Sequence, residues 1–493
     1  MSAAAALVAA AALAGCGTTT YFAGRGLPPS GLRTRVLIAI QNPSALSTGA
    51  VEFVDAHYDI RCKYNADNCS APAFAIAGFS GNLPLSIQNM PEELTGAVYS
   101  SGDGTLTQLN YSAEKTIGAV GGLNGASSSV FITRNQTYIF AASQSAHVLT
   151  VVDKSSTNSG SYPLSLPGVY RVSVNPGGSV ALAFVQNSNS VYYPIKLTSA
   201  ETVAYSGGPA TWPKGAQDCE PQAAPGWCLF QALDPSGNPL ILDRPVKALF
   251  SSDGGTAYVL NCGPECGGTK ASITPLPVAP MIYLVGRASG TLPATTAPSA
   301  QCGTVNLSTG CIPIPGGANN ALIDSSTMYV VGQKQMTDTC SGGSLCWGGY
   351  MTVVNLATNK VATSTSTVPN PVSISDGAPG GVSRMIEADN NTLWIGMKQC
   401  INGERANNNL PFGCLTMVNT TNNAATLMPY NGDATGIAAV TGMNKIYTVE
   451  GGQVYIYSTV DGSAIDNRYV TVTGTAYDVA FMDAETDANN TVY

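Results

Sequence analysis

The sequence predicts an all-β protein built as a single β-propeller, and three observations lead to this fold class. Short runs of Val, Ile, Tyr and Thr recur along the chain, separated by Gly, Asn, Asp and Ser, as is typical of strands joined by tight turns. No segment shows a convincing helical period. The strand pattern repeats at intervals that begin near 40 residues, the length of one four-stranded propeller blade.

The repeat is clearest between residues 172 and 197. Residues 172–174 form a first predicted strand, and residues 180–184 and 191–195 form the second and third. Aligned on the second strand, the copies are 41, 43, 75, 71, 65 and 53 residues apart, at Tyr99, Phe140, Ala183, Tyr258, Tyr329, Trp394 and Tyr447. A series of immunoglobulin-like sandwiches would need about 100 residues per unit, so the short spacing argues against that fold.

The two ends of the repeat region are expected to share one blade. Residues 36–40 and 51–55 match the second and third strands of a blade that lacks a first strand, whereas residues 477–481 match a first strand with little after it. Pairing these strands would close the ring and remove exposed strand edges. Counting first strands favours eight blades, and seven stays open because residues 270–315 and 491–493 are ambiguous.

Composition bounds the possible partners. The 493 residues include 22 Lys and Arg against 30 Asp and Glu, a net charge of −8, and no basic stripe is present. We therefore expect no nucleic-acid partner, because such a protein must neutralise phosphates. Charged residues make up only 11% of the chain, but 44% hydrophobic residues are enough for a large core, so the low charge does not indicate disorder.

Residues 1–15 are expected to be a lipoprotein signal peptide. Leu13-Ala14-Gly15-Cys16 closes an Ala-rich apolar run and resembles the lipobox of bacterial lipoproteins, in which the cysteine, here Cys16, carries the lipid. Residues 16–34 would then form a flexible tether and residues 35–493 the propeller. A disordered Ala-rich tail and an ordinary cleaved signal are the alternatives.

The leader also sets the expected location. Its first basic residue is Arg25, whereas an export signal normally begins with positive charge, so we expect the true start to lie upstream. Gly17 after the lipidated cysteine resembles the pattern that sends lipoproteins to the outer membrane. A lipid anchor holds a protein there without a spanning helix, since each buried methylene contributes about 0.8 kcal/mol. The expected protein is extracytoplasmic and attached to the membrane by lipid alone.

The cysteine count supports this compartment. Setting Cys16 aside from the 13 cysteines leaves twelve, an even number suited to disulfides in an oxidising environment. We expect sequential pairs: Cys62 with Cys69, Cys219 with Cys228, Cys262 with Cys266, Cys302 with Cys311, Cys340 with Cys346, and Cys400 with Cys414. Exchange between the third and fourth pairs stays open. Metal binding by the third pair is the weaker alternative, because neither a second close pair nor a His partner follows.

The cysteines fall largely in expanded loops that we expect to gather on one face. In a propeller, the connections between second and third strands all emerge on the same face, which places four insertions together, at residues 57–72, 261–270, 332–349 and 397–412. They are rich in Asn, Gly and Ser and include aromatic residues such as Trp347 and Phe412. We expect this face to bind a protein or polysaccharide of the cell envelope; the alternative is that the insertions have no binding role.

Catalytic motifs are largely absent from the sequence. The only histidines are His57 and His147, and both are expected to be solvated or structural rather than catalytic. Neither G-x-S-x-G nor H-E-x-x-H nor a phosphate-binding G-x-x-x-x-G-K occurs. The chain is therefore expected to be a non-enzymatic binding module or scaffold.

One acidic run is a weak candidate for calcium, and no other cofactor is expected. Asp483, Glu485, Asp487 and Asn489 alternate like the first ligands of a calcium loop, although the sixth-position Gly and the closing Glu are missing. A solvated turn is the alternative.

The recurring Tyr-Val-x-Asn/Gly and Val-x-Asp/Asn pattern, over roughly residues 35–485, resembles the YVTN, YncE-like and surface-layer propellers of bacteria, here as a lipoprotein. The long Cys-bearing insertions depart from the plain repeat of that family. Such motifs specify architecture far more than activity. Propeller lactonases use Glu, Asn and Asp around a central calcium, so a metal-dependent lactonase or lyase using Glu387 and Asn391 is one alternative. A scaffold for outer-membrane assembly is another, although the Trp-containing repeat of that relative is missing.

Overall fold

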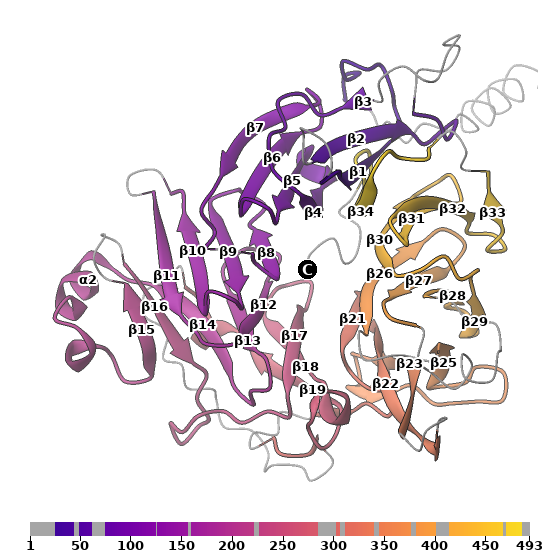
Figure 1. The fold of residues 1–493 in the computed structure, drawn as a ribbon. Coiled ribbons are helices and arrows are strands. Elements are labelled where there is room, and N and C mark those ends of the chain that lie inside the picture. The colour runs from indigo at the N-terminus through magenta and orange to yellow at the C-terminus, as the bar shows by residue number, and fades with distance from the viewer. Residues whose placement is uncertain are drawn as a thin grey trace, which may run out of the picture.

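The computed structural model describes residues 25–43, 49–61, 74–124, 126–155, 159–220, 226–283, 302–305, 311–339, 345–375, 381–400, 414–466 and 470–485. Eight antiparallel sheets stand around a common axis as the blades of one propeller (Figure 1). This architecture confirms the expected fold class and settles the blade number at eight.

Each blade is described here from its innermost strand outward. Blade 1 contains β34 (Thr475–Phe481), β1 (Arg35–Gln41), β2 (Gly49–Asp55) and β3 (Phe74–Ala75). Blade 2 contains β4 (Pro84–Met90), β5 (Thr95–Ser100), β6 (Thr105–Asn110) and β7 (Lys115–Val120). Blade 3 contains β8 (Ser129–Ile132), β9 (Tyr138–Ser143), β10 (Val148–Asp153) and β11 (Gly160–Ser165). Blade 4 contains β12 (Val169–Val174), β13 (Ala181–Val185), β14 (Val191–Lys196), β16 (Trp227–Gln231) and β15 (Ala216–Glu220).

The second half of the ring follows the same plan. Blade 5 contains β17 (Pro245–Phe250), β18 (Thr256–Asn261), β19 (Ser272–Pro277) and β20 (Ile312–Pro313). Blade 6 contains β21 (Asn320–Asp324), β22 (Thr327–Thr339), β23 (Leu345–Asn355) and β24 (Lys360–Val361), and β25 (Val372–Ser375) also pairs with β23. Blade 7 contains β26 (Val382–Ala388), β27 (Thr392–Met397), β28 (Leu415–Asn419) and β29 (Ala424–Leu427). Blade 8 contains β30 (Ala434–Val440), β31 (Lys445–Glu450), β32 (Gln453–Ser458) and β33 (Ala464–Ile465).

The ring closes through pairing between the two ends of the described chain. β34 pairs antiparallel with β1, with Ala480 opposite Leu37, so blade 1 takes its innermost strand from the C-terminal region. This is the shared blade expected from the sequence. Residues just before β1 also pack onto the ring: Leu32 is buried, and Ser30 Oγ donates a hydrogen bond to Glu114. Ordered packing therefore begins before the boundary expected at residue 35.

Burial explains which residues form which strands. β1 is buried at all seven positions because neighbouring sheets cover both of its faces, which suits a nearly continuous apolar run. The outer strand β7 alternates exposed and half-buried residues, because solvent covers one of its faces. Aromatic side chains fill the wider space between the outer parts of blades 3 and 4. Trp227 is fully buried there, with its ring centroid 5.4 Å from that of Tyr283 and 5.8 Å from that of Tyr138.

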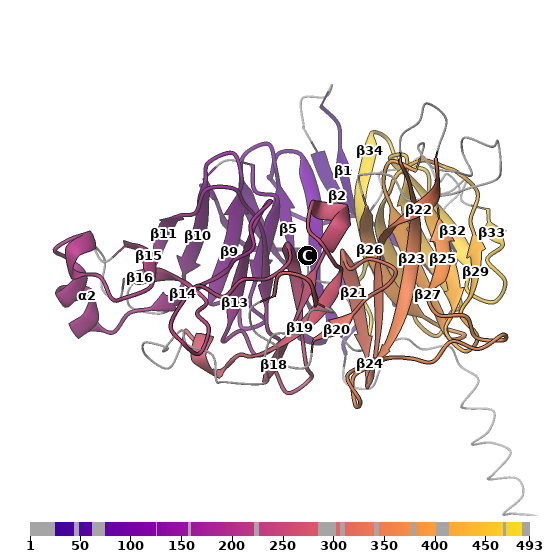
Figure 2. The ribbon, with the colours of Figure 1, turned by 90° about the horizontal axis from the view of Figure 1, so that it is seen from below.

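One α-helix was not expected from the sequence. α2 (Ser199–Tyr205) lies in the connection between β14 and β15 and projects from the edge of the ring (Figures 1 and 2). At seven residues it is too short to show a clear helical period. Its Thr198 and Glu201 form a reciprocal capping box, which was the available sequence signal. This helix and β15 together account for the long spacing after the copy at Ala183. Four short 3-10 helices, η1 (Pro91–Glu93), η2 (Pro209–Thr211), η3 (Gly263–Cys266) and η4 (Ala279–Met281), also occur in the described chain.

The strand order corrects one expected loop position. We use "loop face" for the end of the ring at which second strands connect to third strands, as β18 does to β19 around η3. Residues 57–72 follow β2, which is the third strand of blade 1, so antiparallel pairing places their start at the opposite end. Lys445 Nζ, at the start of β31, accordingly donates hydrogen bonds to the backbone carbonyls of Ala56 and His57. The expectation that this insertion joins the other three was therefore wrong.

Within the described part of the chain, no helix has the length and apolarity needed to span a membrane.

Candidate functional site

Basic side chains converge in the central channel. A cavity of about 340 Å³ lies there, and each of the eight innermost strands contributes at least one residue to its wall. Four of the walls' side chains are basic: Arg171, Lys247, Arg384 and Lys398. The chain has only 22 Lys and Arg in total and carries a net charge of −8. The cluster of four basic side chains is therefore opposite in sign to the net charge of the protein.

The cavity lies toward the loop face. Its lining residues stand near the first residues of the innermost strands, and Lys398 directly follows β27. Because β26 and β27 are antiparallel, the start of one and the end of the other lie at the same end of the blade. The cavity therefore faces the same end as the connections around η3 and after β27.

A repeated backbone irregularity positions the polar residues of the wall. Six of the eight innermost strands shift register by one residue near their start, as β-bulges do. A bulge places two residues opposite one and re-aims the neighbouring side chains. The residues that directly follow the extra residue are Ser86, Arg171, Lys247, Arg384, Gly436 and Asp478. Three basic residues thus occupy equivalent positions in three blades.

Lys247 is a buried lysine in this wall. Its side chain belongs to a residue that is 8% exposed, and Nζ donates a hydrogen bond to Asn320 Oδ1 on the neighbouring blade, 2.8 Å away. Burial, together with the charges of Arg171 and Arg384, lowers its pKa from the usual value to about 7. An anion placed beside Lys247 would favour its charged form.

Arg384 is paired with Asp478, which occupies the equivalent position in blade 1. The two form a buried ion pair, and Asp478 also accepts hydrogen bonds from the backbone N–H groups of Ile87 and Val479. Burial raises the pKa of Asp478, an effect that Arg384 opposes. The equivalent position of blade 8 is Gly436, where a Cβ atom would lie 2.8 Å from Asp478 Oδ1. Glycine therefore leaves room for the carboxylate.

The other two basic groups are more accessible. Arg171 is half-buried, lies over the Tyr170 ring, and donates from Nη1 to the Val246 carbonyl, 3.3 Å away. Lys398 is exposed to solvent at the loop face, yet the surrounding protein lowers its pKa through desolvation, and Arg384 adds to this effect. Asp433 opposes the shift.

Hydroxyl groups complete the wall. They come from Ser86, Ser127, Ser128, Ser129, Ser383 and Thr435. The Thr435 hydroxyl is buried and has no hydrogen-bond partner within the residues that the structure describes. The hydroxyls of Ser127, Ser128 and Ser383 donate to backbone carbonyls. The cations and the Thr435 hydroxyl therefore make the lining suited to the oxygen atoms of carboxylate, phosphate or sulfate groups.

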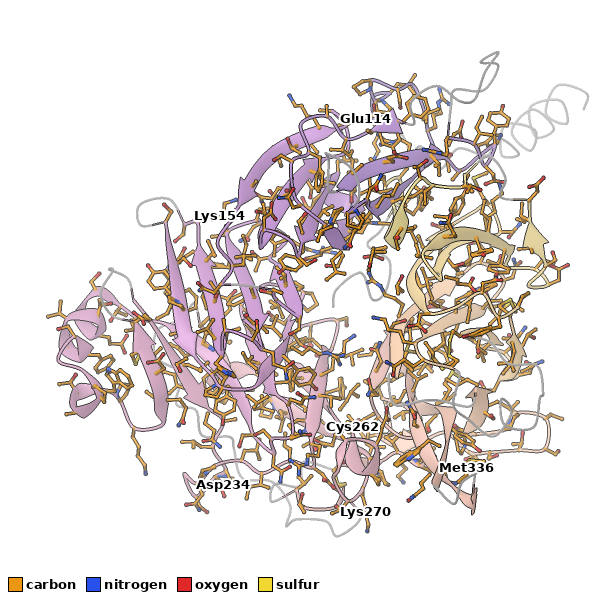
Figure 3. The ribbon with its side chains drawn as sticks, in the orientation of Figure 1. Glu114, Lys154, Asp234, Cys262, Lys270 and Met336 are labelled. Atoms are coloured by element: carbon orange, nitrogen blue, oxygen red, sulfur yellow. A yellow bond between two sulfur atoms is a disulfide. The ribbon has the colours of Figure 1, made fainter. Side chains whose placement is uncertain are left out.

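A second cavity, of about 570 Å³ and more open, lies between blades 5 and 6 at the loop face. Half-buried Trp347 lines it, together with Pro264, Pro313 and Pro315. Figure 3 labels Cys262 and Lys270 in the β18–β19 connection and Met336 on β22 of the neighbouring blade. Trp347 thus lies on the face where we expected it, whereas Phe412 lies outside the described residues. The protein or polysaccharide partner stays a prediction.

Four of the six expected disulfides are present, as sequential pairs: Cys219–Cys228, Cys262–Cys266, Cys302–Cys311 and Cys400–Cys414. The exchange left open between the third and fourth pairs does not occur. The first of these bonds joins residues directly opposite each other on β15 and β16. Cys62, Cys69 and Cys340 lie outside the described residues, as does the side chain of Cys346.

The expected calcium run is described only in part. Asp483 is fully buried, and both of its carboxylate oxygens accept hydrogen bonds from Arg35. Glu485 is exposed, and Asp487 and Asn489 lie outside the described residues, as does Cys16. Among the residues that the structure does describe, no group of three or more His, Cys, Asp or Glu is arranged to hold a metal ion.

The other side chains considered from the sequence lie away from the channel cavity. Glu387 and Asn391 are at the far end of β26 and in the turn after it, and neither lines this cavity. His57 and His147 are exposed residues outside it as well. The Lys247 and Arg384 positions were missed, because the bulges that align them are backbone features. The available signal was a basic residue that interrupts the first apolar run of a repeat.

No protein-family model matches the sequence, and no curated protein matches it. The solved structures similar to this chain include apo AztD from Citrobacter koseri, at 12% identity over 93% of this chain and 99% of that one, with a TM-score of 0.44. They include the periplasmic gluconolactonase PpgL of Pseudomonas aeruginosa, at 12% identity over 91% and 98%, with a TM-score of 0.38.

A third similar structure is the dihydro-heme d1 dehydrogenase NirN in complex with DHE, at 11% identity over 96% of this chain and 78% of that one, with a TM-score of 0.48. At such identities and scores, none of these similarities bears on what this protein binds.

Proposed function

We propose that the protein is a binding module that holds a small, multiply charged anion in its central channel. The observation that carries this proposal is the convergence of Arg171, Lys247 and Arg384, at equivalent positions of three blades, on one cavity. Carboxylate, phosphate and sulfate groups share the chemistry that such a lining would recognise.

The charges in the wall favour an anion over a neutral ligand. Asp478 offsets Arg384 in a buried ion pair, and the charge of Asp433 opposes the lowering of the Lys398 pKa. Arg171 and Lys247 then leave the cavity with an excess of positive charge. Buried like charges are unfavourable for folding, so their presence at one site indicates a binding role. The attraction between a unit positive charge and an anion about 4 Å away is roughly 1 kcal/mol in bulk water and roughly 4 kcal/mol near a protein surface.

The size of the cavity fits a metabolite rather than a polymer. Its volume of about 340 Å³ lies near the lower end of the range of small-molecule sites. The Thr435 hydroxyl, which has no hydrogen-bond partner within the described residues, can donate to an anion oxygen that the cations do not reach.

Calorimetric titration tests the proposal. The purified protein is titrated with sulfate, phosphate, citrate and, as a neutral control, glucose. We expect at least one of the anions to bind, and the affinity to fall as salt increases. R171M and K247M should each weaken this binding about tenfold or more, whereas K360M, which removes an exposed charge on β24, should not. Glucose binding equal to that of the anions, or equal affinities for all variants, would contradict the proposal.

We also propose that the mature protein is a lipoprotein of the YVTN and YncE-like type, anchored at the outer membrane through Cys16. The four disulfides support an oxidising compartment outside the cytoplasm. Labelled palmitate should be incorporated by the wild type in cells and not by C16S. Equal labelling of the two proteins would exclude this anchor.

A further inference from the structure

We propose that Lys247 forms a Schiff base with a small anion that carries a carbonyl group, of which 2-oxo acids are the simplest class. This inference rests on the proposed anion site and adds a covalent step to it. It starts from Lys247, which lines the cavity together with Arg171 and Arg384 of other blades.

The amine is held in place by a neutral partner. Lys247 Nζ donates to Asn320 Oδ1 at 2.8 Å, and the residue is 8% exposed. An amide oxygen accepts an N–H from an ammonium and from a neutral amine alike. The neutral amine can therefore keep this hydrogen bond while its nitrogen carries a lone pair.

The surroundings favour that neutral form near physiological pH. Burial, together with the charges of Arg171 and Arg384, lowers the pKa of Lys247 to about 7. A lysine in solution is almost entirely protonated at neutral pH and is a poor nucleophile. A desolvated lysine beside other cations is the arrangement that activates an amine toward carbonyl compounds.

The same arginines give the site its selectivity. A carboxylate prefers the planar guanidinium fork, which can bind both of its oxygens. Arg171, on the blade next to that of Lys247, is half-buried and lines the same cavity. In a 2-oxo acid the carbonyl carbon is bonded directly to the carboxylate carbon, so docking the carboxylate on an arginine brings the carbonyl to the neighbouring amine.

The step balances without an oxidant or a reductant. The nitrogen lone pair attacks the carbonyl carbon, the C=O π electrons move to oxygen, and proton transfer through channel water gives a carbinolamine. The nitrogen lone pair then forms C=N as the hydroxyl group leaves with a proton supplied by the buffer, so one molecule of water is released and one proton is taken up for each neutral amine that reacts. The product is a protonated imine, which keeps a positive charge between the anion and the arginines.

Reductive trapping of the mature protein tests this step. The protein is incubated with pyruvate or 2-oxoglutarate, treated with borohydride, and analysed by intact mass and peptide mapping. Lactate and 2-hydroxyglutarate serve as matched anions without the carbonyl. K247R keeps the positive charge but cannot form the imine, and K360R is the matched control at an exposed lysine. We expect one reduced adduct, mapped to Lys247, at least tenfold above the level in K247R and equal in the wild type and K360R.

The possible results separate the two proposals. Binding of both acid classes with no adduct on Lys247 would overturn the Schiff base and leave the anion site in place. An adduct of equal yield in K247R, or one spread over surface lysines, would also overturn the Schiff base. Failure of all four acids and of the simpler anions to bind would overturn the anion site itself.

Discussion

Arg35, at the start of β1, and Asp483, just after β34, form a fully buried ion pair, with Arg35 Nη2 2.6 Å from Asp483 Oδ1. The two residues are 448 positions apart in the sequence. The same guanidinium also reaches Glu114 Oε1 of blade 2, at 2.8 Å. One arginine thus joins the first strand of the chain, the last strand and the neighbouring blade at the point where the ring closes.

Replacing Arg35 by Met should destabilise the protein strongly. It leaves the carboxylates of Asp483 and Glu114 in the interior without their cation, and breaking a buried pair in this way costs about 3 to 5 kcal/mol. The free energy of unfolding is measured by denaturant titration. The matched control is R134M, because Arg134 pairs with Glu92 at a position where both side chains are 43% exposed. That variant should change stability by no more than about 1 kcal/mol. Similar losses in the two variants would show that Arg35 does not hold the closure.

Binding of simple anions should weaken as pH rises through 7. The pKa of Lys247 is lowered to about 7, so its charge is present below that pH and lost above it. The charged groups around it are Arg171, Arg384 with its partner Asp478, and Lys398, whose pKa is also lowered by desolvation. Sulfate keeps its charge over this range, and its affinity should fall about tenfold between pH 6 and pH 8. In K247M the decrease should vanish.

Proton uptake gives a second measure of the same site. An anion stabilises the charged form of Lys247, so sulfate binding at pH 7.5 should take up protons. Calorimetry in two buffers of different ionisation enthalpy measures the number of protons taken up per sulfate bound. No uptake in the wild type would show that Lys247 does not contact the anion. The carbonyl acids should also take up protons at this pH, because a protonated imine formed from a largely neutral amine gains one positive charge.

Glu265 should make stability depend on pH. Its carboxylate accepts hydrogen bonds from Asn319 Nδ2 at 3.0 Å and from the Gln333 backbone at 2.9 Å, yet burial raises its pKa to about 7. Between pH 4.5 and 7 the unfolded chain loses this proton before the folded protein does. The free energy of unfolding therefore falls as pH rises through this window, and the stabilisation present at low pH is lost above about 7.

E265Q should remove this part of the pH dependence. We expect its loss of stability between pH 4.5 and 8 to be about 1 to 2 kcal/mol smaller than that of the wild type, since the site is half-buried and partly screened. Glu450, whose pKa is also raised to about 7 by burial, keeps its own contribution in both proteins. Parallel stability curves for the wild type and E265Q would contradict the assignment.

The ring could be predicted from the sequence because most strands of a propeller pair with the strands next to them in the chain. The apolar pattern alone placed residues 36–40 and 477–481 in the same blade. The N-terminal end of the repeat region lacks a first strand and the C-terminal end supplies one, so the two incomplete blades can only complete each other. The short α2 was missed because seven residues cannot show a period, although the capping box at Thr198 was visible. The insertion at residues 57–72 was assigned to the wrong face although it follows a predicted third strand rather than a second strand.

The channel site could not be predicted in the same way. Arg171, Lys247 and Arg384 lie in different repeats, and their equivalence depends on a one-residue register shift in each strand. A side-chain pattern of period two does not reveal such a shift, which reverses the face on which the following residues lie. The depressed pKa of Lys247 is likewise a property of burial beside two cations that the linear sequence keeps far apart.

The disulfide Cys400–Cys414 should stabilise both the fold and the channel site. It joins the connection after β27 to the start of β28, and Lys398 lies two residues before Cys400. Removing a cross-link across 14 residues should cost about 3 kcal/mol in the chain-entropy view. In C400A/C414A the freed connection should also hold Lys398 less firmly, so sulfate binding should weaken by about three- to tenfold.

The matched control is C219A/C228A, which removes a bond between β15 and β16 at the outer edge of blade 4. Its cross-link spans nine residues, so a loss of about 2 to 3 kcal/mol is expected. Sulfate affinity should stay unchanged, because these strands do not line the channel cavity. Denaturant titration and calorimetry on both variants separate the two effects. If the two variants lose sulfate affinity equally, the loss reflects general destabilisation. The Cys400–Cys414 disulfide would then not position Lys398 for binding.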